Sequence, residues 1–314
     1  MKSIGGYFEL ELSSKNEYHF DAIRLNTGRN ALEYIMLSKK YKKVYMPYYT
    51  CDVLLQPIYK YVINFEFYSI DEKFEPIFDF SKIADDECFL YTNYFGLKDE
   101  YVNVIASFCK NLVIDNAQSF YSMPVDQVDT FYSPRKFFGV PDGGYLYTNK
   151  KLEIEYEKDF SHSRFDHLLT RIDKNAESGY GAFVANDEKL DNVPILEMSQ
   201  LTQTLLKSID YDLIAQKRIA NYLYLDKELG GSNKLKIDFN KTQVPMVYPF
   251  WGNSELRKKL IENKVYTAKY WPNVIEWSQE NSLEAQFAEE IIHLPIDQRL
   301  TEKELDVILK NIIG

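Results

Sequence analysis

Residues 112–118 read LVIDNAQ and residues 133–144 read SPRKFFGVPDGG, and these two stretches decide the fold. In the first, three apolar residues end in Asp115, which is the pattern of a buried strand that delivers a carboxylate to its carboxyl end. In the second, Lys136 lies three positions after Ser133 and seven before a Gly-Gly pair. Ligands of parallel sheets bind beyond the carboxyl ends of the strands, so we expect the carboxylate and the amine at one edge of a sheet.

The segments around these stretches alternate between two patterns from residue 20 to residue 150. Short apolar segments rich in β-formers predict strands, and the segments between them carry the spacing of amphipathic helices. Strands interleaved with helices favour parallel pairing, with helices on both faces of the sheet. We therefore predict an α/β fold with a mostly parallel central sheet.

The chain divides into three predicted parts. Residues 1–20 alternate loosely and indicate a strand or an extended N-terminal arm, and residues 21–205 form the large domain. Residues 206–314 form a smaller C-terminal α+β domain, reached through a long helical pattern over residues 197–229 that ends at a Gly pair. Near the end of the chain, Thr301 and Glu304 have the spacing of a capping box, which predicts a final helix.

Composition excludes several classes of function. The net charge of -10 argues against a nucleic-acid partner, because phosphate contacts need clustered Lys and Arg. No run approaches the roughly 18 apolar residues of a spanning helix, and no signal peptide is recognisable, so we expect a cytoplasmic protein without membrane contact. The three cysteines lack CxxC spacing and the four histidines lack metal-ligand spacing. We expect reduced thiols and no bound metal.

A lysine, a carboxylate and a hydroxyl are the set that pyridoxal phosphate (PLP) chemistry requires, and Lys136, Asp115 and Ser133 supply them. The amine of Lys136 would bond to the cofactor aldehyde, and Asp115 would keep the pyridine nitrogen protonated so that the ring withdraws electrons. The Ser133 hydroxyl would hold the phosphate. Each residue also has a plainer interpretation: Lys136 as a surface lysine between strands, and Asp115 as the cap of the next turn.

Residues 27–30, which read TGRN, lie where a strand gives way to a helix. Free backbone N–H groups and the helix dipole bind phosphate well at such a point. Gly28 permits close backbone approach, Thr27 offers a hydroxyl, and Arg29 can pair with a dianion. An ordinary helix N-cap is the alternative.

Three further residues are candidates for the same mouth. Gln118 could donate a hydrogen bond to the phenolic oxygen of the cofactor ring, and Tyr49 and Tyr94 follow two predicted strands. Planar aromatic side chains at those positions suit the wall of a pocket for a planar ring. Both tyrosines could equally be core residues.

At this point the pattern becomes familiar, because the chain resembles the DegT/StrS-type sugar aminotransferases, PLP enzymes of fold type I. The matching pieces extend over most of the chain. They are TGRNAL at 27–32, MPYYT at 46–50, DNAQ at 115–118, the lysine-to-glycine spacing of 136–144, and LPI at 294–296 before the final helix.

The resemblance implies a role for each matched residue. Lys136 is the lysine that holds the cofactor and moves a proton between it and the substrate carbon. Asp115 pairs with the pyridine nitrogen, and Gln118 lies near the ring. The phosphate is held by Thr27, Arg29 and Ser133. The implied protein is a homodimer with active sites at the subunit interface.

The implied reaction is transfer of an amino group, often from glutamate, to a nucleotide-linked keto-sugar, in surface polysaccharide biosynthesis. Two departures concern the site. Cys51 stands where a ring-stacking aromatic residue commonly falls, so Tyr49 or Tyr94 is expected to stack instead. Asn186 is the candidate for the asparagine that the neighbouring subunit contributes, and Tyr94 and Asn186 are the expected substrate contacts.

Two alternatives stay open. One is a PLP- or pyridoxamine-dependent sugar dehydratase or other lyase, because one scaffold supports several reactions. Relatives with that activity usually replace the lysine, so Lys136 favours amino transfer. The other is a binding protein without enzymatic activity that keeps the same fold.

Overall fold

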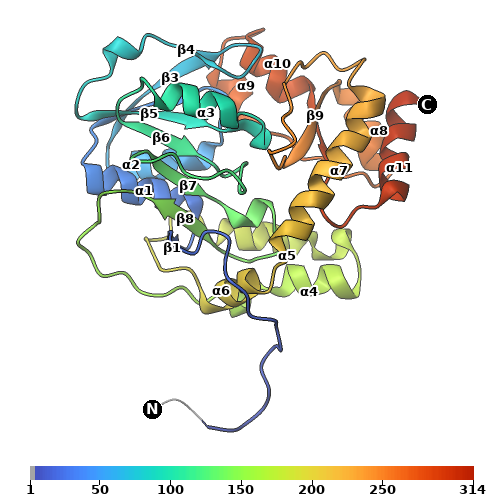
Figure 1. Ribbon diagram of the computed structural model, residues 1–314, viewed down its shortest axis with the longest axis horizontal. Helices are drawn as coiled ribbons and strands as arrows, with labels where there is room; N and C mark the ends of the chain where they lie inside the picture. The colour runs from blue at the N-terminus through green and yellow to red at the C-terminus, as the bar shows by residue number, and fades with distance from the viewer. Residues whose placement is uncertain (1–3) are drawn as a thin grey trace.

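A computed structural model describes residues 4–314 of the chain. Its main feature is an eight-stranded sheet in the order β1-β8-β7-β6-β5-β2-β3-β4 (Figure 1). The strands are β1 (Ile23–Leu25), β2 (Lys43–Pro47), β3 (Asn64–Ile70), β4 (Pro76–Ile77), β5 (Glu87–Thr92), β6 (Leu112–Asp115), β7 (Asp129–Tyr132) and β8 (Gly144–Tyr147). The central run from β7 to β3 is parallel throughout. The predicted mostly parallel sheet is confirmed, with β1, β8 and β4 as antiparallel additions at its two sides.

The sheet is buried on both faces, and β5 illustrates why the sequence requires this. Its side chains alternate between two apolar clusters: Cys88 and Leu90 face one, and Phe89 and Tyr91 face the other. A strand that is apolar on both sides needs cover on both sides, which is typical of parallel sheets. Helices α1 (Gly28–Lys39) and α2 (Leu55–Lys60) contribute to the first cluster, and α3 (Asp99–Ala106) contributes to the second.

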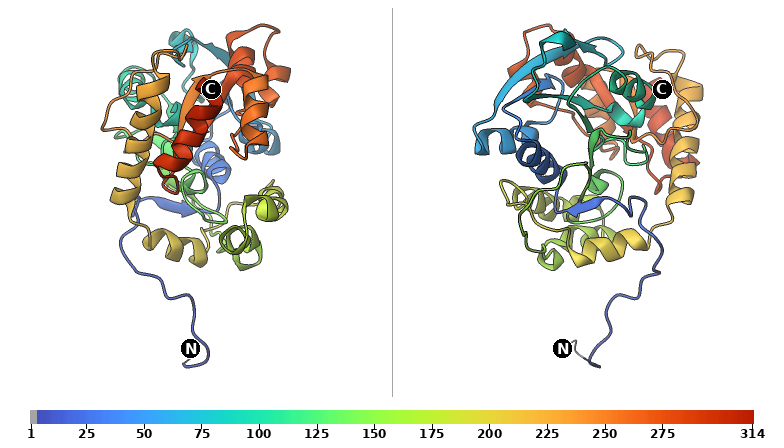
Figure 2. Two further views of the ribbon diagram at one scale, coloured as in Figure 1. Left: turned by 90° about the vertical axis from the view of Figure 1, so that its right-hand side faces the viewer. Right: turned by 60° about the vertical axis from the view of Figure 1, so that its left-hand side comes forward.

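The remaining elements follow the large sheet in the chain. They are α4 (Asp166–Asp173), α5 (Ala176–Glu188), α6 (Gln200–Lys207), α7 (Tyr211–Leu229), β9 (Val247–Trp251), α8 (Ser254–Glu262), α9 (Asn273–Trp277), α10 (Leu283–Glu290), β10 (Ile291–Pro295) and α11 (Glu302–Ile313). Strands β9 and β10 form an antiparallel pair, and α7 and α11 pack together beside it (Figure 2). This arrangement confirms the predicted smaller α+β part. The boundaries at residues 20 and 205 stay predictions.

Two details differ from the sequence-based expectations. The long helix predicted over residues 197–229 is two helices, α6 and α7, because the Asp210 side chain accepts a hydrogen bond from the Leu213 N–H and begins a new helix. Residues 4–16 form no strand. The arm leaves the body ahead of Lys15, whose N–H donates to the Lys207 carbonyl oxygen at 2.8 Å, while residues 1–3 of the predicted arm lie outside the described residues (Figure 1).

Thr301 and Glu304 form the predicted capping box at the start of α11. Among residues 4–314, no helix combines the length and the apolar character needed to cross a bilayer.

Candidate active site

The ends of neighbouring strands bring the two principal residues of the candidate site to one edge of the sheet. Asp115 is the last residue of β6, which pairs in parallel with β7. Directly after β7, the chain makes a 3-10 turn over Pro134–Lys136, with Ser133 as its first flanking residue. The turn exists because Pro134 has no N–H to continue the ladder and is already suited to the first turn of a helix. We call Asp115 and Lys136 the sheet edge.

Asp115 is a buried carboxylate with few partners. Its side chain is 7% exposed, and Oδ1 accepts a hydrogen bond from the Ala117 N–H at 2.8 Å. Burial raises its pKa to about 6, although the Lys136 charge and the Ala117 N–H both act in the opposite direction. A cation placed against this carboxylate would favour its charged form. The site therefore suits a ligand that presents a protonated ring nitrogen.

Lys136 is half-buried, and within the described residues no hydrogen bond or ion pair involves its ammonium group. Its Nζ instead lies over two aromatic rings, 5.5 Å from the centroid of Tyr270 and 5.8 Å from that of Trp271. Both rings come from the segment between α8 and α9. We call Tyr270 and Trp271 the small-domain wall. Cation–π attraction of about 0.5–2 kcal/mol holds an ammonium group in such a place.

The amino end of α1 lies against the lysine turn. A Cβ at Gly28 would be 3.7 Å from the Cβ of Ser133, so the two segments are neighbours. Thr27 caps the helix: its Oγ1 accepts from the Asn30 N–H at 3.0 Å and donates to the Asn30 Oδ1 at 2.6 Å. Ser133 does not cap its own turn with its hydroxyl. Backbone N–H groups at a helix start beside a serine hydroxyl suit a phosphate group.

The backbone around residues 143–144 requires the Gly pair at these positions. A Cβ at Gly144 would collide with the carbonyl oxygen of Thr27, and Gly143 has a φ of +124°. The Gly143 N–H donates to the Asn26 carbonyl oxygen at 2.6 Å. Only glycine lets β8 start this close to the turn before α1. The spacing from Lys136 to the Gly pair thus links the lysine turn to the amino end of α1.

Gln118 has one free polar group inside the site. Its Oε1 accepts from the Phe95 N–H at 2.9 Å, whereas its Nε2 is buried and has no hydrogen-bond partner. An orphaned buried donor costs free energy of about 1–3 kcal/mol, which a ligand oxygen would offset. This geometry fits a donor to the phenolic oxygen of a cofactor ring.

Arg29 is engaged elsewhere. Its guanidinium forms an ion pair with Asp191 and donates to Gln56 Oε1 at 3.1 Å. Its role toward a phosphate therefore stays a prediction.

Tyr49 and Tyr94 lie in the core rather than on the surface of the site. Both are fully buried, and the Tyr94 hydroxyl donates to the Tyr49 carbonyl oxygen at 2.9 Å. The Tyr49 ring contacts the Trp271 ring edge-on, with centroids 5.1 Å apart. In this arrangement Tyr49 supports the small-domain wall from behind. Asn186, on α5, donates to the Pro141 carbonyl oxygen of its own chain at 2.9 Å.

Sequence reasoning missed the small-domain wall and also His293 on β10. The His293 ring lies 4.4 Å from that of Tyr270, and its Nδ1 is 3.1 Å from the Ala268 carbonyl oxygen. That carbonyl accepts from Nδ1–H, so Nε2 carries the lone pair, and Nε2 is buried without a partner. Burial lowers the pKa of His293 to about 3, so the ring is neutral. No local pattern in the sequence could have indicated these positions.

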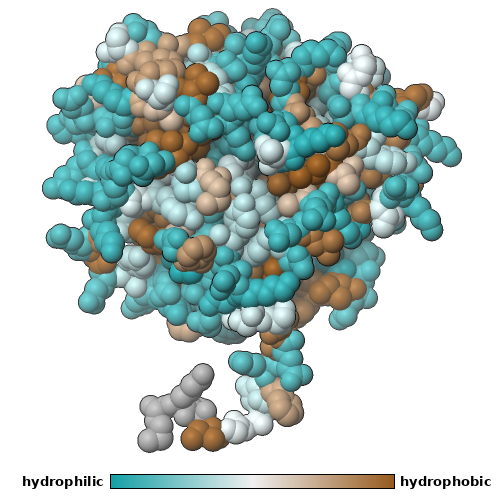
Figure 3. Space-filling model, in the orientation of Figure 1, coloured by the Kyte–Doolittle hydropathy of each residue, from teal (hydrophilic) through white to brown (hydrophobic). Residues whose placement is uncertain are grey.

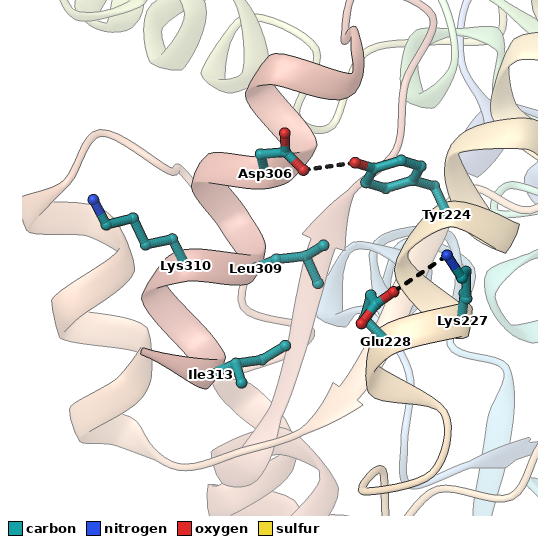
Figure 4. Close-up of a pocket in the computed structure, with 7 residues that line it drawn as sticks. All are labelled: Tyr224, Lys227, Glu228, Asp306, Leu309, Lys310 and Ile313. Carbon is teal, nitrogen blue, oxygen red and sulfur yellow. Dashed lines mark hydrogen bonds and ion pairs between the residues drawn. The ribbon is translucent and has the colours of Figure 1, made fainter.

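A cavity lies away from this edge of the sheet. It has a volume of about 310 Å³ and lies between α7 and α11 (Figure 4). Tyr224 and Asp306 face each other across it at 2.6 Å, and Lys227 pairs with Glu228 on its α7 side. None of its lining residues belongs to the candidate site.

Comparisons with known proteins were informative at the level of structure. No protein-family model matches the chain, and no curated protein matches it by sequence. Sugar aminotransferase CalS13 from Micromonospora echinospora is 14% identical with a TM-score of 0.60, over 93% of this chain and 86% of that one. A DegT DnrJ EryC1 StrS aminotransferase from Brucella abortus is 16% identical with a TM-score of 0.60, over 93% and 85%.

A third similar structure, NtdA from Bacillus subtilis, was solved with bound cofactor PMP. It is 13% identical with a TM-score of 0.64, over 93% of this chain and 72% of that one. At these identities the likeness establishes the fold. The chain therefore has the fold of sugar aminotransferases of the DegT/DnrJ/EryC1/StrS type.

Proposed function

We propose that this protein is a PLP-dependent aminotransferase that moves an amino group from an amino acid, glutamate first, to a nucleotide-linked keto-sugar. One observation carries the proposal: among the described residues, a lysine without a polar partner and a buried carboxylate without an ion-pair contact lie at the carboxyl edge of a parallel sheet, near enough for the lysine charge to act on the carboxylate. Structurally similar proteins carry the name sugar aminotransferase, and NtdA holds PMP. These names support the same reaction class and the same cofactor here.

The residues present fit the cofactor. Asp115 would face the pyridine nitrogen, Gln118 Nε2 would donate to the phenolic oxygen, and Ser133 with the amino end of α1 would hold the phosphate. When bound, PLP supplies an electron sink that stabilises negative charge on the substrate carbon. The Asp115 carboxylate would maintain the charge on the ring nitrogen, and the buried Gln118 amide would orient the ring.

Besides holding the cofactor, Lys136 would move the proton between the cofactor and the substrate carbon. Its amine reaches the site from a tight turn, so it moves only through side-chain rotation and stays close to the reacting carbon. A base within hydrogen-bond reach of the proton it moves typically contributes about 10²–10⁴-fold to the rate. The aromatic faces of the small-domain wall exclude water from one side of the amine.

A homodimer with the site near the subunit interface is part of the proposal. Tyr7 on the arm is 99% exposed, and Ile172 on α4 is 81% exposed. Figure 3 shows apolar, brown atoms on the arm that extends below the body of the molecule. Side chains of this kind on an extended arm and on an outer helix favour burial against a second copy. Light scattering on the full chain should give twice the mass of one chain. A monomer at all concentrations would remove this part of the proposal.

The proposal also includes a pathway and a location: the protein would act in surface polysaccharide biosynthesis, in the cytoplasm. It rests on the sequence resemblance and on the sugar substrates that the names of similar structures indicate. Assay of nucleotide-linked keto-sugars with glutamate as donor tests it, with free keto-sugars as the control. Turnover of free keto-sugars alone would point to a different pathway.

A visible absorbance spectrum tests the central part of the proposal, which is that Lys136 binds PLP. Purified protein mixed with PLP should gain visible absorbance, and borohydride should then fix the cofactor mass on the peptide that contains Lys136. In a second sample that has not been treated with borohydride, glutamate should convert the bound cofactor to its amino form. A colourless protein, or cofactor fixed on another lysine, would refute the function.

A further inference from the structure

Among residues 4–314, Arg218 is a buried arginine without a direct ion pair, although the charge of Asp297 acts on it from a longer distance. It lies on α7, is 2% exposed, and within the described residues makes no ion pair within 4 Å. Its guanidinium donates to four neutral oxygens: Met246 O at 3.0 Å, Gln298 Oε1 at 3.2 Å, Pro245 O at 3.4 Å and Phe137 O at 3.4 Å. Burial of a charge is expensive, and apolar side chains of similar volume often replace buried ionic groups without loss of stability. Packing alone gives no reason for an arginine here.

One of the carbonyl groups that accept from Arg218 belongs to Phe137, the residue directly after Lys136. Phe137 O accepts from Arg218 at 3.4 Å and from Gln298 Nε2 at 3.0 Å, and the guanidinium also lies 4.6 Å from the Phe137 ring centroid. On the other side, the Lys136 N–H donates to the Ser133 carbonyl oxygen at 3.3 Å. The lysine turn is thus held at Lys136 by its own hydrogen bond and, one residue later, by two side chains from residues 206–314.

We propose that Arg218 and Gln298 form a clamp on the Phe137 carbonyl that positions the Lys136 amine. Both are positioning residues, and the inference rests on the proposed function. The clamp fixes the peptide plane between Phe137 and Phe138, one residue beyond Lys136, and so restrains the end of the lysine turn. The direction of the lysine side chain toward Asp115 therefore depends on where α7 and the segment after β10 lie. A displacement of about 1 Å at a reacting group can lower a rate by about 10²-fold. Loss of one of the two hydrogen bonds of the clamp should lower the rate of covalent PLP binding by about tenfold.

The chain offers a matched control for this clamp. Asn221 is a buried amide on α7, whereas Gln298 is a half-buried amide after β10, and the Asn221 Nδ2 donates to the carbonyl oxygens of Ile296 and Asp297, both at 3.1 Å. It therefore ties α7 to the segment that contains Gln298 without touching Phe137. The comparison is between Gln298→Leu and Asn221→Leu. Gln298 is preferred to Arg218 because removal of the guanidinium would leave several buried carbonyl oxygens without a donor.

The first measurement is the rate of covalent PLP binding in full-length protein, followed by visible absorbance after rapid mixing. We expect Gln298→Leu to bind about tenfold more slowly than wild type and Asn221→Leu to stay within about twofold, although both lose similar thermal stability. The pH midpoint of the bound-cofactor spectrum should move in Gln298→Leu alone. Wild-type rates and midpoint in Gln298→Leu, or equal changes in Asn221→Leu, would overturn the clamp.

A second measurement needs no cofactor. Reductive methylation with formaldehyde and cyanoborohydride, read by mass spectrometry, compares Lys136 with exposed Lys258 in the same sample. Loosening the clamp should let the amine leave the small-domain wall, so the Lys136 to Lys258 ratio should rise in Gln298→Leu and not in Asn221→Leu. An unchanged ratio overturns the clamp. If wild type binds no PLP but the ratio rises, the function fails and the clamp stands.

Discussion

The sheet edge and the small-domain wall meet at one amine, yet they come from different kinds of places in the chain. Asp115 and Lys136 end neighbouring parallel strands, and parallel strands present their carboxyl ends at a single edge. Tyr270 and Trp271 follow a helix far along the chain and reach Lys136 only because the C-terminal part packs over that edge. Residues at strand ends thus follow from local pattern, whereas the residues that cover them follow from packing.

Replacement of Lys136 should have the largest effect. Lys136→Ala removes the amine of the sheet edge, so we expect complete loss of visible absorbance with PLP and of amino transfer. Lys98→Ala is the control, because Lys98 is similarly shielded but pairs with Glu75. If Lys136→Ala retained the absorbance, the sheet edge would lose its proposed role.

Replacement of Asp115 should have the next largest effect on catalysis. Asp115→Asn keeps the acceptor for the Ala117 N–H but removes the charge that faces the ring nitrogen. Loss of one preorganised electrostatic contact of this kind costs about 10²–10³-fold in kcat. Steady-state kinetics with saturating PLP would measure it. A kcat within a few-fold of wild type would show that the carboxylate does not act on the ring.

The same residue makes the stability of the cofactor-free protein depend on pH. Burial raises the pKa of Asp115 from 3.8 to about 6, so between those values the unfolded chain has released a proton that the folded chain keeps. The free energy of unfolding therefore falls as pH rises from about 4 to 6, by at most about 3 kcal/mol, and is then level. Asp115→Asn should lack this fall, which denaturation at pH 4 and at pH 8 would measure. Parallel pH curves for both proteins would contradict it.

The small-domain wall should show the smallest of these effects. Tyr270→Ala removes one of two aromatic faces beside Lys136, worth about 1 kcal/mol, or about fivefold in PLP affinity. Tyr270→Phe keeps the face and should bind as wild type does, and Tyr266→Ala, in the same segment but exposed, is the control. Equal losses in Tyr270→Phe and Tyr270→Ala would assign the effect to the hydroxyl instead.

Much of the fold could be predicted from the sequence, and the predictions that were wrong or absent have physical causes. Alternating strands and helices predicted the parallel core, because apolar runs such as that of β6 need cover on both faces. The antiparallel pairing of β8 was not predicted, because the side-chain pattern of a strand does not indicate its direction in the sheet. The predicted helix over residues 197–229 is interrupted because one aspartate cap outweighs a continuous apolar periodicity.

Within the site, the sequence by itself determined which groups stand at the strand ends and which glycines the turns need. Asp115, Lys136 and the Gly pair at 143–144 follow from spacings of a few residues, which local backbone geometry converts directly into position. Only the tertiary structure decided that Tyr49 and Tyr94 are core, that Arg29 is engaged by Asp191, and that Arg218 reaches Phe137. Contacts between distant segments depend on how apolar faces pack together, and no short stretch of sequence contains both partners.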